Sequence, residues 1–442
     1  MSAATTMRGS SFRRGEPGYE EARRATMWNT RVPDRYPDVI VQANTEADAV
    51  AAVKEAAARG MRVAVRSGGH SWSGNHVRDG GLLLDVSRLT SVTIDKAAMR
   101  AVAGPGAGGS VVAMALGRQG LFFPAGHCLG VCLGGYLLQG GFGWNGRVLG
   151  PACESVVGID YIDAEGAVRH ASETENSEML WAARGSGPAF FGVVLRFHLR
   201  VYPKPGFLGL TSATYPIERF DEVFSWARTV GPDVPAAVDL NIMTSRAASL
   251  VRGQGIEVIA PVFEDSWSKA RAAASFMKSR PRGSRLVIPL TKAPLSMLYR
   301  GVMRHYPSST NWRVDNMWTH ASYDELRPGL HRIVESMPSR PSHMLWMNWM
   351  PPSSRRDMAF SAEDDIYIAL YGGWTDPAAA AATSVWAPDR MAEMNHLSTG
   401  SQLADDPGRP ARVLADPHLE RLTALRGTHD PAGTFHNWIG QR

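Results

Sequence analysis

Residues 66–71 read Arg66-Ser67-Gly68-Gly69-His70-Ser71, and they follow an apolar stretch, 61–65, that is typical of a short β-strand. Glycine has no Cβ atom, so this turn can take positive φ angles and present consecutive backbone N–H groups to an anion such as a pyrophosphate. The segment alone leaves a second interpretation open, in which the glycines form a plain tight loop and His70 lies on the surface.

A second glycine-rich stretch begins at Cys128 and continues through Gly134-Gly135-Tyr136 and Gly140-Gly141-Phe142-Gly143. A histidine on one glycine-rich turn and a cysteine on another provide two side chains that can bond covalently to one ring cofactor. The combination indicates a flavin.

Together these segments resemble the FAD-linked oxidases of the vanillyl-alcohol oxidase and p-cresol methylhydroxylase superfamily, and specifically its berberine-bridge-enzyme-like branch. The resemblance is close over residues 18–205, and the matching segments occur in the same order along the chain. These segments are residues 17–23, 64–71, 79–85, 126–138, 142–144, 180–185 and 191–194.

The resemblance implies that His70 bonds the 8α-methyl group of the flavin and that Cys128 bonds its C6 atom. Two such linkages raise the reduction potential of the flavin and anchor it beside an open cleft. Cys132 is a competing thiol, but counting back from Gly134 assigns Cys128 to the family position. The residues expected to contact FAD are Arg66, Ser67, Gly68, Gly69, His70, Ser71, Cys128, Val131, Gly134, Gly135, Tyr136, Gly140, Gly141, Gly143, Gly192, Val194 and Asn437.

The same resemblance implies an α+β fold with a two-part FAD-binding domain, residues 1–205 and 406–442, and a substrate-binding domain, residues 206–405. The strongest linker signal in the chain, Pro203-Lys204-Pro205-Gly206, lies at the first boundary. We expect the substrate domain to contain an antiparallel sheet covered by helices.

Hydrophobic periodicity locates the main elements. Thr45 and Asp48 form a predicted capping box at the start of a helix that Gly60 ends. Further helices are predicted over residues 109–119, 221–230 and 266–277, and strands over 191–201, 238–243, 311–319, 344–350 and 366–374.

Tryptophans and tyrosines are frequent in the later strands. Aromatic residues at strand spacing are more often core than ligand-binding residues, but in the resembling family this sheet forms the floor of the substrate site. The predicted substrate-contacting residues are Asn348, Trp349, Tyr371 and Gln402.

The catalytic base is where the chain departs from the family pattern. Sugar and polyketide oxidases of this type place a tyrosine before the C-terminal helix, whereas residues 400–406 contain none. Gln402 and Asp405 fall at the corresponding positions depending on a one-residue shift of the alignment, and Tyr371, Tyr136 or His396 are candidates from elsewhere in the chain. The predicted catalytic residues are Tyr371, Asp405 and Tyr136, with Tyr371 preferred.

The predicted reaction is removal of a hydride from an alcohol or amine C–H bond of a small molecule, with dioxygen reduced to hydrogen peroxide. In the resembling family a small residue at the position of Val131 leaves room for oxygen at the flavin, so Val131 favours an oxidase; ordinary packing is the other interpretation of Val131. The missing tyrosine favours a tailoring oxidase of secondary metabolism. The alternatives are a carbohydrate or oligosaccharide oxidase and a dehydrogenase that uses another acceptor.

Two rival interpretations have less support. Residues 141–146 match the dinucleotide fingerprint G-x-G-x-x-G, but no convincing strand precedes them. A binding or structural protein that keeps the fold would have little use for His70 and Cys128.

Composition excludes several other classes. The 442 residues carry a net charge of +5 that is scattered along the chain, which argues against a nucleic-acid surface. The three cysteines are too few for a disulfide framework, and the sequence predicts no metal site. Residues 1–15 lack an apolar signal segment and no window is apolar enough to span a membrane, so we expect a cytoplasmic protein without membrane partners.

Overall fold

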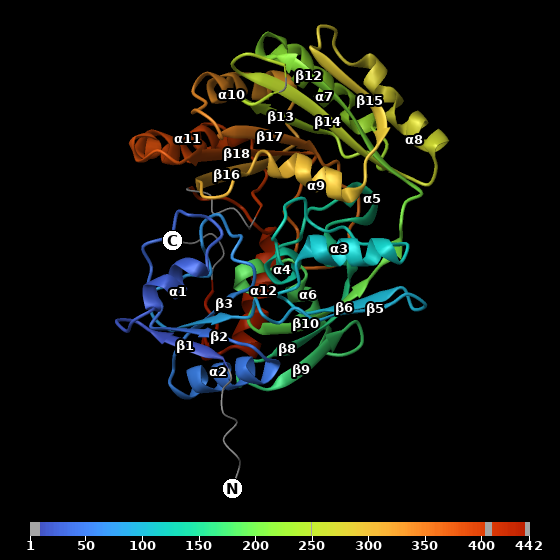
Figure 1. Cartoon of the computed structure of the whole chain (residues 1–442). Coiled ribbons are helices and arrows are strands. Elements are labelled where there is room, and N and C mark those ends of the chain that lie inside the picture. The colour runs from blue at the N-terminus through green and yellow to red at the C-terminus, as the bar shows by residue number, and fades with distance from the viewer. Residues whose placement is uncertain (1–8, 249, 403–408, 438–442) are drawn as a thin grey trace.

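The computed structural model describes residues 9–248, 250–402 and 409–437. The chain forms a lower body, which contains residues 9–200 and the last helix, and an upper body built on a large sheet (Figure 1). The predicted α+β class is confirmed, because helices and sheets occur in both bodies.

The lower body contains two main sheets. In the first, with strand order β1-β2-β4-β3, β4 pairs in parallel with both of its neighbours. The second is antiparallel and has the order β5-β6-β10-β8-β9. The strands are β1 (Ser10–Arg13), β2 (Val39–Gln42), β3 (Val63–Arg66), β4 (Leu82–Asp85), β5 (Val92–Asp95), β6 (Arg100–Ala103), β8 (Val156–Ile162), β9 (Val168–Ser172) and β10 (Val193–Arg200), and β7 (Leu121–Phe122) pairs separately with β11 (Tyr202–Pro203).

Several helices of the lower body form one continuous hydrophobic core with these sheets, whereas the first helix packs with Ile40 and Leu83 in a separate cluster. The predicted capping box is present: the Thr45 hydroxyl accepts a hydrogen bond from Asp48 N–H, while the Asp48 carboxylate accepts from Thr45 N–H. Gly60, with a φ of +63°, follows the end of that helix. The helices are α1 (Tyr19–Ala25), α2 (Glu46–Ala58), α3 (Gly109–Arg118), α4 (Leu133–Leu138), α5 (Gly146–Leu149) and α6 (Ser177–Ala183).

The upper body is organised around a seven-stranded sheet with the order β15-β12-β14-β13-β17-β18-β16. Every pairing in this sheet is antiparallel, as the sequence predicts. The strands are β12 (Phe207–Pro216), β13 (Asn241–Ser245), β14 (Gly255–Glu264), β15 (Leu286–Lys292), β16 (Asn311–Thr319), β17 (His343–Asn348) and β18 (Ile366–Trp374).

The two faces of this sheet pack against different partners. One face contributes Trp346, Ile368 and Leu370 to a core with the covering helices. The other face carries Met347, Tyr367 and Tyr371 in an aromatic cluster that also includes residues of the lower body. The helices are α7 (Phe220–Val230), α8 (Trp267–Ala273), α9 (Leu295–Met303), α10 (Tyr323–Glu335) and α11 (Ala380–Glu393).

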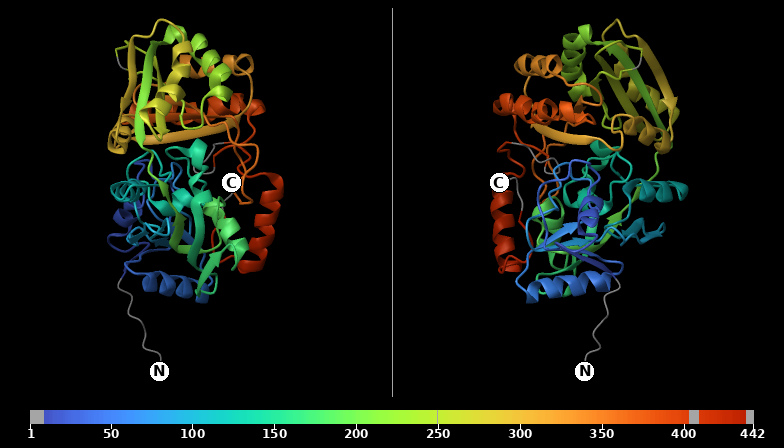
Figure 2. Two further views of the ribbon diagram at one scale, coloured as in Figure 1. Left: turned by 90° about the vertical axis from the view of Figure 1, so that its right-hand side faces the viewer. Right: turned by 60° about the vertical axis from the view of Figure 1, so that its left-hand side comes forward.

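After the upper body, the chain returns to the lower one. Helix α12 (Asp416–His429), drawn in red, runs along the side of the lower body in both views of Figure 2. Leu422 and Leu425 join the lower core, and Phe435 forms a parallel bridge with Val63 at the start of β3. The C-terminal segment therefore reaches the strand that precedes the His70 turn.

Two local expectations are settled by the backbone. Residues 238–243 were expected to be a strand, but β13 begins at Asn241, because Val238 makes only an isolated bridge. The segment 141–146 follows α4 rather than a strand, which excludes the dinucleotide-binding interpretation. Among the described residues, no helix is both long and apolar enough to cross a membrane.

Candidate active site

A cavity of about 280 Å³ lies where the loops of the lower body meet the sheet of the upper body. Its lower wall comes from the turn after β3 and from residues 126–142, and its upper wall comes from β17, β18 and the end of α9. The two glycine-rich segments singled out in the sequence therefore converge on one site.

The turn after β3 is fixed by glycine and by an ion pair. Gly69 has a φ of +69°, and a Cβ atom there would collide with the Thr26 carbonyl oxygen, so no larger residue fits. The Arg66 guanidinium donates to both carboxylate oxygens of Asp85 at 3.0 Å and to Thr26 O at 3.1 Å. These contacts hold the 66–71 turn against β4, and both glycines of the turn line the cavity.

His70 projects into this cavity as a neutral imidazole. Its ring stacks on Trp28 with centroids 5.1 Å apart, and burial, aided by the nearby Arg66 charge, lowers the pKa of His70 to about 4. A Cβ atom at Gly130 would lie 2.9 Å from His70 Nε2. The second loop therefore passes directly beside His70, two residues after Cys128.

Both candidate cysteines line the cavity, but they have different neighbours. Cys128 packs against the aromatic cluster of the upper sheet, and burial raises the pKa of its thiol to about 12. Cys132 lies against the first turn, where a Cβ atom at Gly68 would be 3.0 Å from its Sγ. Cys128 is thus the thiol on the side of the cavity that faces β17 and β18.

The upper wall is aromatic and apolar. Tyr371 stacks on His343 with centroids 4.6 Å apart and an interplanar angle of 16°, and it makes edge contacts with Trp72 and Tyr306 at 5.5 and 5.3 Å. Burial lowers the pKa of His343 to about 3, and its Nδ1 lies 2.9 Å from Pro341 O. The ring beneath Tyr371 is therefore a neutral imidazole.

A second hollow of about 100 Å³ continues from the first, since the two share Val65, Ser67 and Gly135 among their lining residues. In the part of the chain that the structure describes, buried polar atoms without a hydrogen-bond partner line these hollows, namely Asn75 Nδ2, Gln139 Oε1 and His436 Nε2. Buried polar atoms are normally satisfied. A long, narrow hollow with such atoms fits an extended ligand such as FAD.

The structure brings most of the predicted cofactor residues to this double hollow. The lining residues are Arg66, Ser67, Gly68, Gly69, His70, Ser71, Cys128, Val131, Gly134, Gly135, Tyr136, Gly141, Gly192 and Val194.

Three predicted cofactor residues are not among the lining residues. Gly140 and Gly143 instead allow close packing, because Cβ atoms there would strike the Phe360 ring and the Tyr136 hydroxyl. Asn437 is exposed, whereas its neighbour His436 lines the second hollow. His436 is therefore placed to make the FAD contact that was expected from Asn437.

Of the predicted substrate residues, Tyr371 and Gln402 line the cavity and two others do not. Asn348 is fully buried on the opposite face of the sheet, where its amide accepts from Trp346 Nε1 and donates to Ala227 O. Its prediction as a substrate residue is wrong for this cavity. Trp349 lies behind the wall and contacts Phe142 edge to face, with centroids 4.8 Å apart.

The predicted catalytic residues have different settings. The Tyr136 ring lines the cavity, but its hydroxyl donates to Pro124 O at 2.6 Å and burial raises the pKa of this phenol well above its ordinary value. Such a phenol is poorly placed to accept a proton. Asp405 lies outside the described residues, and Tyr371 lies on β18 at the cavity wall.

Sequence reasoning missed several wall residues because they are distant in sequence from the glycine motifs. Trp28 and Tyr306 lie outside the predicted strands. Leu345 and Met347 lie on β17, but the sequence does not show which residues of this strand face the cavity. Trp72 could have been found, since it follows Ser71 directly.

Comparisons with known proteins agree with this geometry. Residues 37–172 match the family described as FAD binding domain. The chain is 30% identical over 432 residues to FAD-linked oxidoreductase nodO of Hypoxylon pulicicidum, covering 95% of this chain and 94% of that protein. It is 36% identical over 193 residues to xylooligosaccharide oxidase of Thermothelomyces thermophilus, covering 42% of this chain and 39% of that enzyme.

Solved structures share the fold. 6-Hydroxy-D-nicotine oxidase from Arthrobacter nicotinovorans superposes with a TM-score of 0.85 at 18% identity, covering 100% of this chain and 99% of that one. The wild-type BBE-like 1 protein of Physcomitrella patens gives a TM-score of 0.82 at 18% identity, with 98% and 96% covered. The chain therefore has the fold of these proteins, as its resemblance to the berberine-bridge-enzyme-like branch predicts, and with its relative of 30% identity over nearly the whole length it belongs to the FAD-linked oxidoreductases.

Proposed function

We propose that this FAD-dependent oxidoreductase is an oxidase of a neutral, largely apolar small molecule, and that it tethers its flavin through His70 and Cys128. The oxidised group is an alcohol or amine, whose C–H hydrogen leaves as hydride and whose O–H or N–H hydrogen leaves as a proton. Dioxygen takes up the two electrons and two protons as hydrogen peroxide. FAD supplies the hydride acceptor in this chemistry.

The uncharged aromatic wall carries the substrate proposal. Among the described residues that line the cavity, Arg66 alone carries a full charge, and Asp85 neutralises it through two hydrogen bonds. Burial lowers the pKa values of His70 and His127 to about 4, so both imidazoles are neutral near pH 7. Such a cavity offers no counter-charge for an ionic substrate and a large apolar surface for a hydrophobic one.

The tethers are supported by the meeting of two loops. His70 Nε2 lies beside Gly130, and Cys128 lies two residues earlier on the same loop. A neutral imidazole can act as a nucleophile because its lone pair is available. The buried Cys128 thiol, with its raised pKa, needs local deprotonation before it can bond carbon, since the thiolate is the nucleophile.

Tyr371 is the proposed proton acceptor. It lies on the cavity wall, whereas the hydroxyl of Tyr136 is bound to a backbone carbonyl. An ordinary phenol has a pKa of about 10, so Tyr371 must have its phenolate stabilised during the reaction. The stacked His343 is neutral and supplies no positive charge. We propose that a hydrogen bond from the substrate or the cofactor contributes to that stabilisation.

Val131 supports the oxidase rather than the dehydrogenase assignment. It lines the cavity three residues after Cys128, and its carbonyl accepts a hydrogen bond from Gly109 N–H at 2.8 Å, which fixes the loop. A valine leaves more room at this position than a leucine or isoleucine. The proposed consequence is access for dioxygen.

Oxygen uptake with a substrate panel tests the proposal. The purified holoprotein is supplied with hydrophobic aromatic and terpenoid alcohols, matched secondary amines, and chito- and xylo-oligosaccharides, and hydrogen peroxide is measured in parallel. Turnover with a hydrophobic alcohol or amine and weak turnover with sugars is expected. Turnover confined to oligosaccharides would establish the carbohydrate-oxidase alternative, which the partial match to xylooligosaccharide oxidase favours. Reduction of a dye acceptor without oxygen uptake would establish a dehydrogenase.

A further inference from the structure

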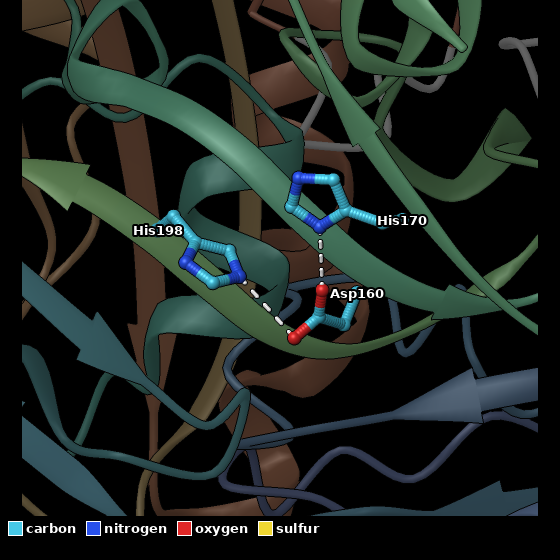
Figure 3. A group of neighbouring side chains, drawn as sticks. All are labelled: Asp160, His170 and His198. Atoms are coloured by element: carbon cyan, nitrogen blue, oxygen red, sulfur yellow. Dashed lines mark hydrogen bonds and ion pairs between the residues drawn. The ribbon is translucent and has the colours of Figure 1, made fainter. Parts of the chain in front are cut away.

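Three potential metal ligands meet on the five-stranded sheet of the lower body. Asp160 on β8, His170 on β9 and His198 on β10 point toward one another from adjacent strands (Figure 3). The Asp160 carboxylate contacts His170 Nδ1 at 2.7 Å and His198 Nε2 at 3.2 Å. None of the three lines the flavin cavity.

Strand register explains how these residues come together. Asp160 and His170 are direct cross-strand partners, and His198 lies opposite Gly158 on the other neighbouring strand. Residues two apart in a strand share a face, so Gly158 and Asp160 lie on the same side of β8. The sequence alone did not predict the group because its members are 10 and 28 residues apart along the chain, as the printed numbering shows.

Gly158 lies beside both histidines. A Cβ atom at this position would lie 3.4 Å from the His170 ring and 3.6 Å from His198 Cβ. A Cβ atom there would therefore be in van der Waals contact with both residues, and glycine leaves this position unfilled.

The ligand chemistry selects one class of ion. Two imidazole nitrogens and one carboxylate oxygen are the ligand types of zinc and similar divalent transition metals, whereas calcium and magnesium prefer oxygen alone. The three ligand atoms lie within 4.8 Å of one another. Because zinc–ligand distances are about 2.0–2.2 Å, two ligand atoms on one ion are at most about 4.4 Å apart, so small side-chain rotations close the site.

Charge around the group is also compatible with a cation. Arg196 Nη1 lies 3.6 Å from the Asp160 carboxylate, but Glu46 accepts two hydrogen bonds from this guanidinium at 2.8 and 2.6 Å and compensates its charge.

We propose that Asp160, His170 and His198 form a surface binding site for a divalent transition-metal ion of the zinc class, with water completing the coordination. The side chains of Asp160, His170 and His198 are 19%, 39% and 31% exposed, so an ion has direct access. The site bridges β9, β8 and β10, and a bound ion stabilises the folded sheet because it binds the folded state selectively.

Zinc titration of the tag-free, EDTA-treated holoprotein tests the site by calorimetry. One zinc ion per chain is expected for the native protein, together with a rise in melting temperature. Asp160→Asn, His170→Ala and His198→Ala should each abolish that binding step. The matched control is His331→Ala. His331 Nε2 lies 2.6 Å from the Asp221 carboxylate, so this pair also joins a histidine to an aspartate, but it has only one histidine. The His331→Ala variant should bind zinc as the native protein does.

Flavin absorbance and the melting temperature without zinc show whether each variant is folded. If His170→Ala is unfolded, Asp160→Asn provides the same test with little change in volume. Zinc binding that is absent from the native protein, or that persists undiminished in the folded Asp160→Asn and His198→Ala variants, would overturn the proposal.

Discussion

His70 and Gly130 approach each other so closely that a Cβ atom at Gly130 would lie 2.9 Å from His70 Nε2. Gly130 also has a φ of +84°, a conformation that L side chains rarely adopt. This position therefore brings the loop of Cys128 against the turn of His70. The bicovalent proposal depends on this proximity, and its consequences can be measured separately for each residue.

Removing one tether should leave the other. His70→Ala is expected to keep flavin bound through Cys128, and Cys128→Ala should keep it bound through His70. The double variant should release flavin on denaturation. In-gel flavin fluorescence and intact mass distinguish these states.

Cys132→Ala serves as the matched control for the thiol. It should retain both linkages, because Cys132 lies against Gly68 and not in the aromatic cluster beside Cys128. Loss of the thiol linkage in Cys132→Ala, with retention in Cys128→Ala, would reassign the tether to Cys132.

Enlarging Val131 should slow reoxidation. Val131→Leu adds one methylene to a cavity-lining side chain and is expected to hinder dioxygen more than it hinders the substrate. Rapid mixing of the substrate-reduced protein with oxygenated buffer measures the rate directly, and Val131→Ala is the control. Reoxidation that is already slow in the native protein would identify a dehydrogenase.

Removing the Tyr371 hydroxyl should slow flavin reduction. Tyr371→Phe keeps the stacked ring on His343 but removes the proton acceptor, so the anaerobic reduction rate is expected to fall by roughly 10²-fold or more. Stopped-flow absorbance follows the reaction, and reoxidation should be unchanged. Tyr367→Phe, four residues earlier on the same wall, is the matched control. Equal reduction rates in Tyr371→Phe and the native protein would exclude Tyr371 as the base.

Asp239 should make the stability of the protein decrease as pH rises. Burial raises its pKa from 3.8 to about 7, while a hydrogen bond from Asn145 N–H acts in the opposite direction. The folded state therefore binds the proton more tightly than the unfolded state, and its advantage is lost as pH rises from about 4 to 7. The melting temperature of Asp239→Asn should fall less than that of the native protein between pH 5 and pH 8. Parallel pH profiles for the two proteins would contradict this assignment.

Much of the fold is readable from local patterns. The sequence predicts β16 and β18 at their observed bounds, and the Thr45 capping box marks the start of α2 correctly. These features depend on residues that are close in sequence. The two glycine-rich segments are likewise local, and both were identified before their convergence on one cavity was visible.

The orientation of the upper sheet is not readable in the same way. All nine residues of β18 are buried, because helices cover one face and the lower body covers the other. Without alternating burial, the sequence pattern does not show which face each residue occupies. β17 also lacks alternating burial, since five of its six residues are buried, and Asn348 was assigned to the wrong face for this reason. Tyr306 was missed because its approach to Tyr371 is a tertiary contact.

The central claim is that one flavin is held by both loops, and peptide mapping of the denatured native protein tests it most directly. The protein is precipitated with acid, washed, digested and examined by mass spectrometry. The account predicts a yellow pellet and a single flavin-bearing species in which the peptides of His70 and Cys128 are joined through the cofactor. A colourless pellet with all of the flavin in the supernatant would contradict it.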